Sequence, residues 1–362
     1  METKQWKDVL HIISGKNQKA VANPNGKYPI YGSGGIISYA DDYLCEAGTT
    51  IVGRKGTINK PIFVDEPFWN IDTAFGVAPG KNLNPKYLYY FCLYFNFMPL
   101  DKSTGRPSLA KSDLLKIKMP VPSLSKQEQI VKQIEESLSQ LDSAVATLKK
   151  TKQQLEIYRL SILNQAFSDN RQMIPFGRIT EARLGKMLDK EKNTGKLQRY
   201  LRNINVRWFE FDLSDLLEMR IEADEQEKYS ITNGDLVICE GGEPGRCAVW
   251  ENEETIFYQK ALHRVRFTDG SNPKYYMYYL WLINKSGALS KYFTGTGIKH
   301  LTGQSLTKVL VPQTELSQQD KTVEYIENQF YTFDRIEETI NQSLRQTEVL
   351  RQSVLKQAFE GD

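Results

Sequence analysis

A segment of 44 residues occurs twice in this chain, and this duplication limits the folds available to it. Residues 124–167 align without a gap on residues 316–359 at a constant offset of 192, and 16 of the 44 positions are identical. Self-similarity at a fixed offset is typical of a repeated architecture. Each copy follows a more variable segment. The sequence therefore predicts two globular blocks, each followed by one copy of the repeat.

The duplication extends upstream into the globular blocks with small shifts of register. Asn-Pro-Lys-Tyr occurs at residues 84–87 and 272–275, and Thr-Gly occurs at residues 104–105 and 296–297. A length of 362 residues also agrees with two domains of ordinary size. We therefore expect both halves of the chain to have the same organisation.

The repeated segments are predicted to be long helices. Residues 126–167 and 318–359 contain neither Gly nor Pro, so each can run for about 63 Å at 1.5 Å per residue. Ser125 and Ser317 each precede an acidic residue by three positions, which predicts a capping box at both helix starts. Apolar residues recur at alternate steps of three and four, as in the seam of a coiled coil. Polar residues interrupt this seam at Lys152, Arg159, Glu337, Thr347 and Arg351.

Two such helices can pair with each other inside one chain, or a single helix can mediate homodimerisation. Intramolecular antiparallel pairing would place the two globular blocks at opposite ends. We predict an α+β fold with two mixed α/β domains, each followed by a long helix. The two helices would pair as an antiparallel coiled coil, giving a pseudo-two-fold internal repeat. The expected domain boundaries are 1–122, 123–168, 169–314 and 315–362.

The globular blocks are expected to be rich in strands. Strands are predicted at residues 30–39 around a glycine turn, and at residues 49–53, 235–239 and 261–267. Aromatic-rich segments at 87–97 and 275–283 each follow a proline, which favours helices with proline in the first turn.

The net charge of +3 conceals an uneven distribution along the chain. Residues 1–120 carry a net +5 and residues 171–311 a net +3, whereas residues 121–170 are neutral and residues 312–362 carry −5. Residues 171–202 alone contain nine basic and three acidic side chains. A local excess of this kind attracts phosphate.

Composition argues against several classes of protein. Four cysteines form no C-x-x-C pair and only three histidines are present, which argues against a structural zinc site. No run of about 18 apolar residues occurs, and the first ten residues lack the apolar core of a signal peptide. We expect a cytoplasmic protein that binds no metal and no membrane.

Motifs of catalysis are incomplete in this sequence. Asn-Pro-Lys-Tyr resembles the Asn-Pro-Pro-Tyr tetrapeptide of amino-methyltransferases, but it departs at the third position and no glycine-rich cofactor loop accompanies it. A helix start with proline at its first position is the favoured interpretation. The sequence lacks G-x-x-x-x-G-K-[ST] and G-x-S-x-G. We therefore expect no catalytic or cofactor site in this chain.

Taken together, the pattern resembles the specificity subunit of type I restriction-modification enzymes. The resemblance rests on the duplicated helices, on their Leu-Ser-x-Gln-[Glu/Asp] openings and Gln-Ala-Phe ends, and on segments 182–187, 200–206 and 234–246. It implies that each block is a target-recognition domain that reads one half of a bipartite, asymmetric DNA site. The helices would set the spacer between the half-sites, which lie about one helical turn of DNA or more apart.

The resemblance also assigns the chemistry to partner proteins. Two adenine-N6 methyltransferase (M) subunits would dock on the helices and bring S-adenosylmethionine, and motor-nuclease (R) subunits would bring ATP and magnesium. The chain itself would bind double-stranded DNA and none of these cofactors, in a system of defence against foreign DNA. The main alternative is a structural coiled-coil adaptor whose globular blocks bind protein, and a free-standing methyltransferase or nuclease is a third hypothesis.

Candidate DNA-contacting residues lie mostly in loops that combine glycine with basic, amide or hydroxyl side chains, because the backbone must approach phosphate while a few side chains reach base edges. The candidates of the first block are Lys16, Lys19, Tyr31, Ser33, Arg54, Lys55, Thr57, Lys60, Lys102, Thr104 and Arg106. Those of the second block are Arg183, Lys186, Arg202, Asn203, Glu240, Glu243, Arg246, Thr296, Lys299 and His300. The two glutamates are included because a carboxylate accepts a hydrogen bond from the cytosine amine. Any one of the basic residues can instead be a solubilising surface charge.

Overall fold

The computed structural model describes residues 2–169, 171–189 and 193–361, and the chain divides into two compact units. The first unit comprises Met1–Lys150 and Ile340–Asp362, and the second comprises Thr151–Thr339. Each unit thus contains one globular block together with segments of both long helices. This division differs from a division by consecutive sequence, because each block packs against parts of two helices.

The two long helices predicted from the repeat are confirmed as α4 (Leu124–Ala166) and α8 (Leu316–Glu360). Their predicted capping boxes are wrong, because both helices begin one residue before the serines, Ser125 and Ser317. At the start of α4 the hydroxyl of Ser123 accepts a hydrogen bond from the Lys126 N–H at 3.4 Å. No helix among the described residues is both long and apolar enough to cross a membrane.

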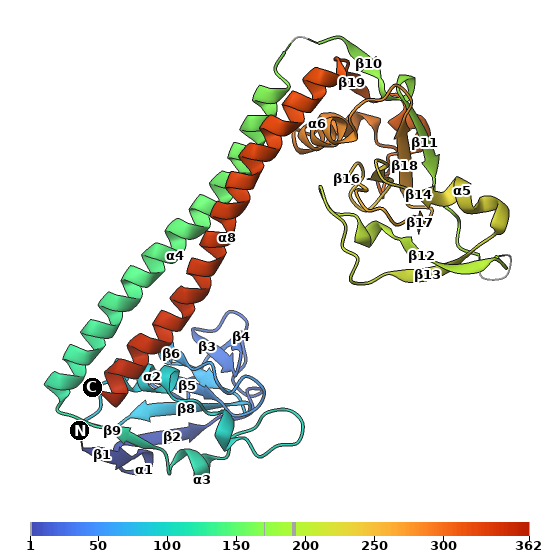
Figure 1. Ribbon diagram of the computed structural model, residues 1–362. Helices are drawn as coiled ribbons and strands as arrows, with labels where there is room; N and C mark the ends of the chain where they lie inside the picture. The colour runs from blue at the N-terminus through green and yellow to red at the C-terminus, as the bar shows by residue number, and fades with distance from the viewer. Residues whose placement is uncertain (1, 170, 190–192, 362) are drawn as a thin grey trace. The chain divides into compact units, whose positions relative to one another are not determined.

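The first unit contains two β-sheets and a short antiparallel strand pair (Figure 1). The larger sheet is antiparallel, with the order β2 (Leu10–Ser14), β8 (Ala74–Pro79), β5 (Thr49–Gly53) and β6 (Ile62–Val64). The smaller sheet has the order β4 (Gly35–Ala40), β3 (Tyr28–Gly32) and β7 (Trp69–Asn70). The pair is β1 (Thr3–Gln5) with β9 (Lys118–Pro120). The short helices are α1 (Trp6–Val9), α2 (Pro85–Tyr94), η1 (Met98–Leu100) and α3 (Lys111–Leu114).

The second unit is built in the same way. Its larger sheet has the order β11 (Thr180–Leu184), β18 (Leu262–Phe267), β15 (Leu236–Cys239) and β16 (Cys247–Val249). Its smaller sheet has the order β13 (Leu217–Ile221), β12 (Lys196–Leu201), β17 (Ile256–Tyr258) and β14 (Ser230–Ile231), and β10 (Met173–Pro175) pairs with β19 (Leu310–Pro312). The remaining elements are η2 (Phe176–Arg178), η3 (Asn203–Asn205), η4 (Ala223–Glu225), α5 (Gln226–Tyr229), α6 (Pro273–Lys285), η5 (Ala288–Tyr292) and α7 (Gly303–Leu306).

The larger sheets of the two units have the same strand order. Numbered by their order along the chain, the four strands of each larger sheet lie side by side in the order first, fourth, second and third. The smaller sheets also correspond, since β3 pairs in parallel with β7 as β12 does with β17. The strands predicted at residues 30–39, 49–53, 235–239 and 261–267 are confirmed. The two globular blocks therefore have the same topology.

The Asn-Pro segments begin helices, as their sequence predicts. Asn84 caps α2 by accepting hydrogen bonds from the N–H groups of Lys86 and Tyr87, and Asn272 accepts from the Lys274 N–H at the start of α6. The side-chain oxygen of Gln127 accepts from the Asn84 N–H at 2.8 Å, and that of Gln319 accepts from the Asn272 N–H at 2.7 Å. Each cap is thereby tied to the start of the long helix that follows its block.

The core of each unit also includes the end of the other long helix. In the first unit Phe359 of α8 packs against Tyr87, with ring centroids 5.1 Å apart. In the second unit Phe167, which follows α4, packs against Tyr275 at 5.0 Å. Phe167 and Phe359 are equivalent positions of the repeat. Burial of such aromatic rings is worth about 2–3 kcal/mol each and fixes the helix end on the block.

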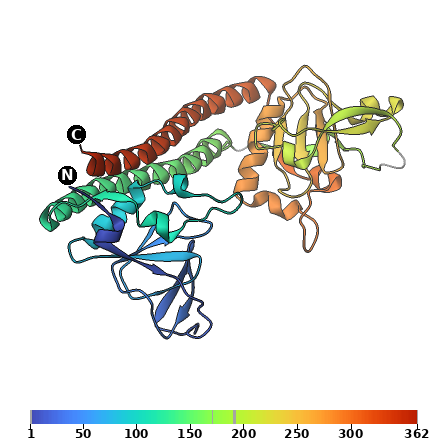
Figure 2. The same cartoon turned by 90° about the horizontal axis from the view of Figure 1, so that it is seen from below.

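In each unit, segments of α4 and α8 lie side by side (Figures 1 and 2). An ion pair joins Arg351 to Asp142 in the first unit, and Arg159 contacts Asp334 at 2.6 Å in the second. Lys152 contacts Glu337 at 3.2 Å. Polar residues that interrupt the apolar seam are therefore partners across the helix pair.

Candidate nucleic-acid interface

In the first unit, loops that carry predicted DNA-contacting residues meet at one end of the strands of the larger sheet. The Leu109 N–H donates to the Arg54 carbonyl at 2.8 Å, and the Gly56 N–H donates to the Pro107 carbonyl at 2.8 Å. These bonds join the loop after β5, residues 54–60, to residues 101–108. A Cβ on Gly56, whose φ is +84°, would lie 2.7 Å from the guanidinium of Arg106. Because L side chains rarely adopt this positive φ, the turn at residue 56 favours glycine.

The loop that follows β2 lies at the same end of the strands. The Lys16 N–H donates to the Asn70 carbonyl at 3.0 Å, and the N–H groups of Arg54 and Lys55 donate to the Thr73 carbonyl. Residues 70–73 therefore lie between the two loops. The exposed candidates of this unit are Lys16, Lys19, Lys55, Lys60, Lys102, Thr104 and Arg106, and Thr57 and Arg54 are half-buried.

Two lysines of the first unit already have acidic neighbours. Lys55 lies 3.9 Å from Asp72, and Lys102 lies 2.7 Å from Asp113. The hydrogen bond from Lys102 lowers the pKa of the Asp113 carboxyl below its ordinary value. Both lysines are exposed enough for such pairs to be weak and to exchange with phosphate.

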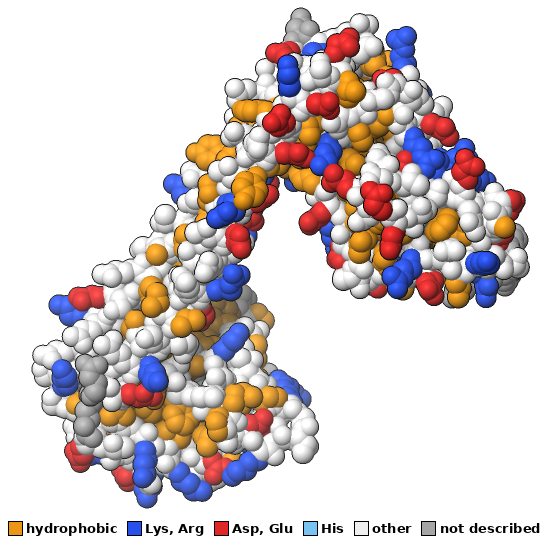
Figure 3. Space-filling model, viewed as in Figure 1, with side chains coloured by type: hydrophobic (Ala, Val, Ile, Leu, Met, Phe, Trp, Pro, Cys, Tyr) orange, Lys and Arg blue, Asp and Glu red, His pale blue; other side chains and the backbone are white. Residues whose placement is uncertain are grey.

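Equivalent loops meet in the second unit. The Leu301 N–H donates to the Glu240 carbonyl at 2.7 Å, which joins residues 240–246 to residues 294–300. The Asn203 amide donates to the Gly241 carbonyl. Thr296 and Lys299 are exposed and His300 is half-exposed. The face of the second unit drawn in Figure 3 carries acidic side chains among the basic ones.

Several candidates of the second unit have partners inside the protein. Arg246 donates to the Asn203 carbonyl at 2.9 Å and contacts Glu243 at 3.1 Å. Glu243 also accepts from the indole N–H of Trp208 at 2.8 Å, and Arg202 contacts Asp215 at 2.7 Å. The remaining pair is Arg183 with Glu181, at 3.4 Å. Arg202, Glu243 and Arg246 therefore hold the loops in place.

Three candidates are buried, which corrects the predictions made for them. Tyr31 and Ser33 are 9% and 7% exposed, and the Tyr31 ring packs edge-on against Phe68 at 5.4 Å. Lys186 is 5% exposed and forms ion pairs with Glu222 and Glu225. Their side chains are occupied by the fold and do not face solvent.

The surroundings of the buried Lys186 favour its charged form. Burial lowers the pKa of Lys186, but hydrogen bonds to Glu222 and Glu225 raise it by more, so the pKa lies above its ordinary value. The hydrogen bond from Lys186 lowers the pKa of Glu222 to about 2. Lys186 and Glu222 are thus both ionised near neutral pH.

Several buried polar atoms near the second unit's loops have no hydrogen-bond partner among the described residues. They are Nε of Arg202, Oδ1 of Asn203, Nε of Arg246 and Nδ1 of His263. Unsatisfied buried polar atoms are uncommon in native proteins, because nearly all such groups bond to protein or to ordered water. His263 was not among the sequence candidates, because a lone histidine in an alternating strand gives no signal.

Sequence reasoning also missed Ile298. This side chain is 74% exposed in the loop that contains Thr296 and Lys299. An exposed aliphatic group beside basic residues can contact the thymine methyl group or insert between base steps. The signal in the sequence that could have identified it is a single apolar residue in the otherwise polar loop Thr-Gly-Ile-Lys.

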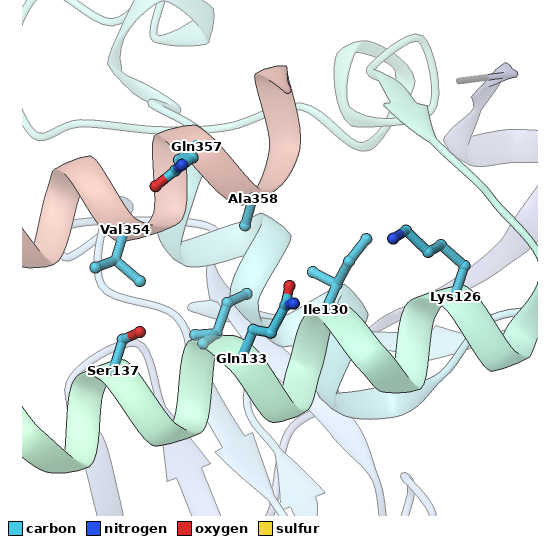
Figure 4. A pocket seen from close by; sticks show the side chains of 8 residues that line it. Lys126, Ile130, Gln133, Ser137, Val354, Gln357 and Ala358 are labelled. Carbon is cyan, nitrogen blue, oxygen red and sulfur yellow. The ribbon is translucent and has the colours of Figure 1, made fainter. Parts of the chain in front are cut away.

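A cavity of about 460 Å³ lies between α4 and α8 in the first unit (Figure 4). Gln133 of α4 and Gln357 of α8 line it together with apolar residues of both helices. At the equivalent place in the second unit, Tyr325 donates a hydrogen bond to the Gln165 side chain at 3.3 Å. The lining of the cavity supplies two amides, a hydroxyl and a lysine but no carboxylate, imidazole or thiol. Among the described residues, no cluster of three or more His, Cys, Asp or Glu side chains is positioned to bind a metal ion.

The sequence model of the type I restriction modification DNA specificity domain matches residues 1–157 and 183–346. The chain belongs to this family. The resemblance inferred from the repeat is thereby confirmed, and the mixed α/β fold with two specificity domains agrees with it.

Relatives of this specificity family match along most of their length. The chain is 24% identical over 361 residues to the type I restriction enzyme specificity subunit S.HindORF215P of Haemophilus influenzae, covering 94% of this chain and 90% of that protein. It is 24% identical over 342 residues to the EcoKI specificity subunit of Escherichia coli, covering 86% and 73%.

Solved structures of this family share the fold. One, from work on complex assembly and conformational transition of the type I R-M system, has a TM-score of 0.80 at 14% identity and covers 100% of this chain and 98% of that chain. The HsdS subunit from Thermoanaerobacter tengcongensis has a TM-score of 0.61 at 16% identity, with 100% and 97% covered.

Proposed function

We propose that this chain is the DNA-specificity subunit of a type I restriction-modification system, and that each globular block reads one half of a bipartite, asymmetric DNA site. The observation that carries the proposal is that two blocks of one topology bring equivalent loops together but fill them with different side chains. A common scaffold with different loop chemistry suits two different half-sites. The recognition domains would be residues 1–122 and 169–314.

The long helices, with residues 123–168 and 315–362, would pair over their whole length as an antiparallel coiled coil and set the spacer. Reciprocal contacts support this: Arg351 meets Asp142, and Arg159 meets Asp334. These are equivalent positions of the repeat with the roles of the helices exchanged. Such reciprocity is what a pseudo-two-fold axis between the helices would produce.

Two methyltransferase subunits would dock on the exposed faces of the helices. S-adenosylmethionine would be bound by these partners, and ATP and magnesium by the motor-nuclease subunits. The specificity subunit would have no catalytic site and would act in the cytoplasm.

The exposed basic residues would contact phosphate, chiefly Lys16, Lys19, Lys60 and Lys299. Phosphate contacts position the protein but carry no sequence information. The partnered residues Arg202, Asn203, Glu243 and Arg246 would shape the loop beside the bases.

The test is to co-express the full chain with its methyltransferase partner and to map methylated adenines in the host genome. We expect one bipartite, asymmetric motif. Replacing residues 1–122 with the equivalent block of another family member should change one half of this motif and leave the other half intact. A change in both halves would contradict the assignment of one half-site to each block.

DNA binding also separates this proposal from the adaptor hypothesis. Phosphate contacts release counterions, so the affinity for duplex DNA should fall steeply between about 50 and 200 mM salt. Absence of DNA binding, with protein partners retained, would favour the adaptor.

A further inference from the structure

Arg54 and Glu240 occupy the same backbone position in the two units. Each directly follows an inner strand of the larger sheet, β5 or β15. The Arg54 N–H donates to the Thr73 carbonyl and the Glu240 N–H to the Ala261 carbonyl, at 2.8 and 2.9 Å. Their carbonyls accept from Leu109 and Leu301, which recur at an offset of 192. One scaffold position therefore carries opposite charges in the two units.

The Arg54 guanidinium is held but not neutralised. Its central carbon lies 5.6 Å from the centre of the Phe75 ring, and the side chain is half-buried. Within the described part of the chain, no carboxylate lies within 4 Å of it. Its basic neighbours in the loop, Lys55 and Lys60, lie toward solvent. A guanidinium oriented by an aromatic ring and free of ion pairs keeps its donors available to a ligand.

The Glu240 carboxylate is likewise half-buried without an ion pair to any described residue. The nearby Arg246 is engaged by Glu243 and by the Asn203 carbonyl. A free carboxylate in a loop that faces DNA repels phosphate, so it weakens binding unless it accepts a hydrogen bond from a base. The exocyclic amine of cytosine is the major-groove donor suited to this role.

We propose that this shared position determines specificity in both units, with Arg54 selecting guanine in one half-site and Glu240 selecting cytosine in the other. Arginine pairs with the two acceptors of the guanine edge, and glutamate accepts from the cytosine amine. The inference rests on the proposed function and adds the base class that each unit requires at one position. The paired glutamate and arginine three and six residues further along, Glu243 and Arg246, would not select bases.

The experiment uses the full chain co-expressed with its methyltransferase partner, with methylated sites mapped across the genome. Arg54→Gln should lower the preference for guanine at one position of one half-site about tenfold and raise that for adenine. Glu240→Gln should lower the preference for cytosine in the other half-site by a similar factor. Lys81→Gln and Glu254→Gln, at exposed positions outside the proposed interface, are matched controls and should leave the motif unchanged.

Arg54→Lys is the control for a loss of folding. It keeps the positive charge but lacks the guanidinium that can form two parallel hydrogen bonds to guanine. It should retain complex formation and still lose discrimination at the same position. A wild-type motif without guanine in one half or without cytosine in the other would overturn the inference, as would variants that keep the motif or lose methylation evenly at all sites. A wild-type chain with no bipartite motif would instead contradict the proposed function itself.

Discussion

Lys16 and Lys186 stand at the same backbone position of the two units but have opposite environments. Each lies two residues after the first strand of the larger sheet, and its N–H donates to the carbonyl of Asn70 or Tyr258, at 3.0 and 3.1 Å. Lys16 is exposed, whereas Lys186 is 5% exposed and bonded to two glutamates. The same residue type thus faces solvent in one unit and stabilises the interior of the other.

The difference arises from a segment that the second unit has in addition. Glu222 precedes η4 and Glu225 ends it, and together with α5 they cover the lysine. The strong basic excess of residues 171–202 is therefore partly neutralised by acidic residues further along the chain, and Lys190 and Lys192 of that stretch lie outside the described residues. Local charge counts overestimate the charge that faces a ligand when ion pairs connect distant segments.

Of the pairs of equivalent residues compared here, Lys186 and Lys16 should differ most in how much their replacement lowers the stability of the protein. Lys186→Ala leaves two carboxylates without their partner, each about a quarter exposed, and should lower the free energy of unfolding by about 3 kcal/mol. Lys16→Ala should change it by less than about 0.5 kcal/mol. Urea unfolding followed by circular dichroism measures both values.

A triple variant provides the control for this prediction. Lys186→Met with Glu222→Gln and Glu225→Gln removes all three charges at once and should recover most of the stability lost by Lys186→Ala. Equal effects of Lys16→Ala and Lys186→Ala would show that the two environments do not differ energetically.

Arg159 and Arg351, the equivalent arginines of the two long helices, should differ less in the stability that each contributes. Arg159 is 12% exposed and contacts Glu156, Asp334 and Glu337, whereas Arg351 is 26% exposed and contacts Asp142. Arg159→Ala should cost about 2 kcal/mol and Arg351→Ala about 1 kcal/mol. Hydrogen exchange reports the two helix segments separately. A larger effect at Arg351 would contradict the ranking by burial.

The sequence was sufficient for the features that are local or duplicated. The helix caps at Asn84 and Asn272 follow from the Asn-Pro order, and the long helices follow from the absence of Gly and Pro. The burial of Lys186 was not predictable, because its partners lie 36 and 39 residues away in a segment without a counterpart in the first half. Tyr31 was misassigned because a glycine turn is equally compatible with an exposed loop and with a buried hairpin.

Arg106 and Ile298 are equivalent residues, because both follow the repeated Thr-Gly at an offset of 192. Their replacement should affect DNA binding in different ways. Arg106→Ala should weaken DNA binding evenly over all sequences and reduce its salt dependence by about one ion. Ile298→Ala should weaken binding about fivefold, only at sites where it meets a thymine methyl or a deformable base step.

Competition binding at several salt concentrations distinguishes the two. Leu350→Ala, an equally aliphatic and 51% exposed position on α8, is the control for general loss of apolar surface. If Ile298→Ala changed the salt dependence and not the sequence preference, the apolar contact would be excluded.

The smallest effect should come from His263, which occupies the place of Phe75 in the other unit. Each pairs with the equivalent residue of the inner strand, Ile238 or Val52. Burial lowers the pKa of His263, so below about pH 6.5 the unfolded chain binds a proton that the folded chain does not. The free energy of unfolding should therefore fall as the pH drops from 7.5 to 5.5. His263→Phe, which installs the residue of the first unit, should reduce this slope, and the exposed-site control His11→Phe should not. An unchanged slope in His263→Phe would mean that the histidine has the same pKa in the folded and unfolded chains, so that its burial has no linkage to pH.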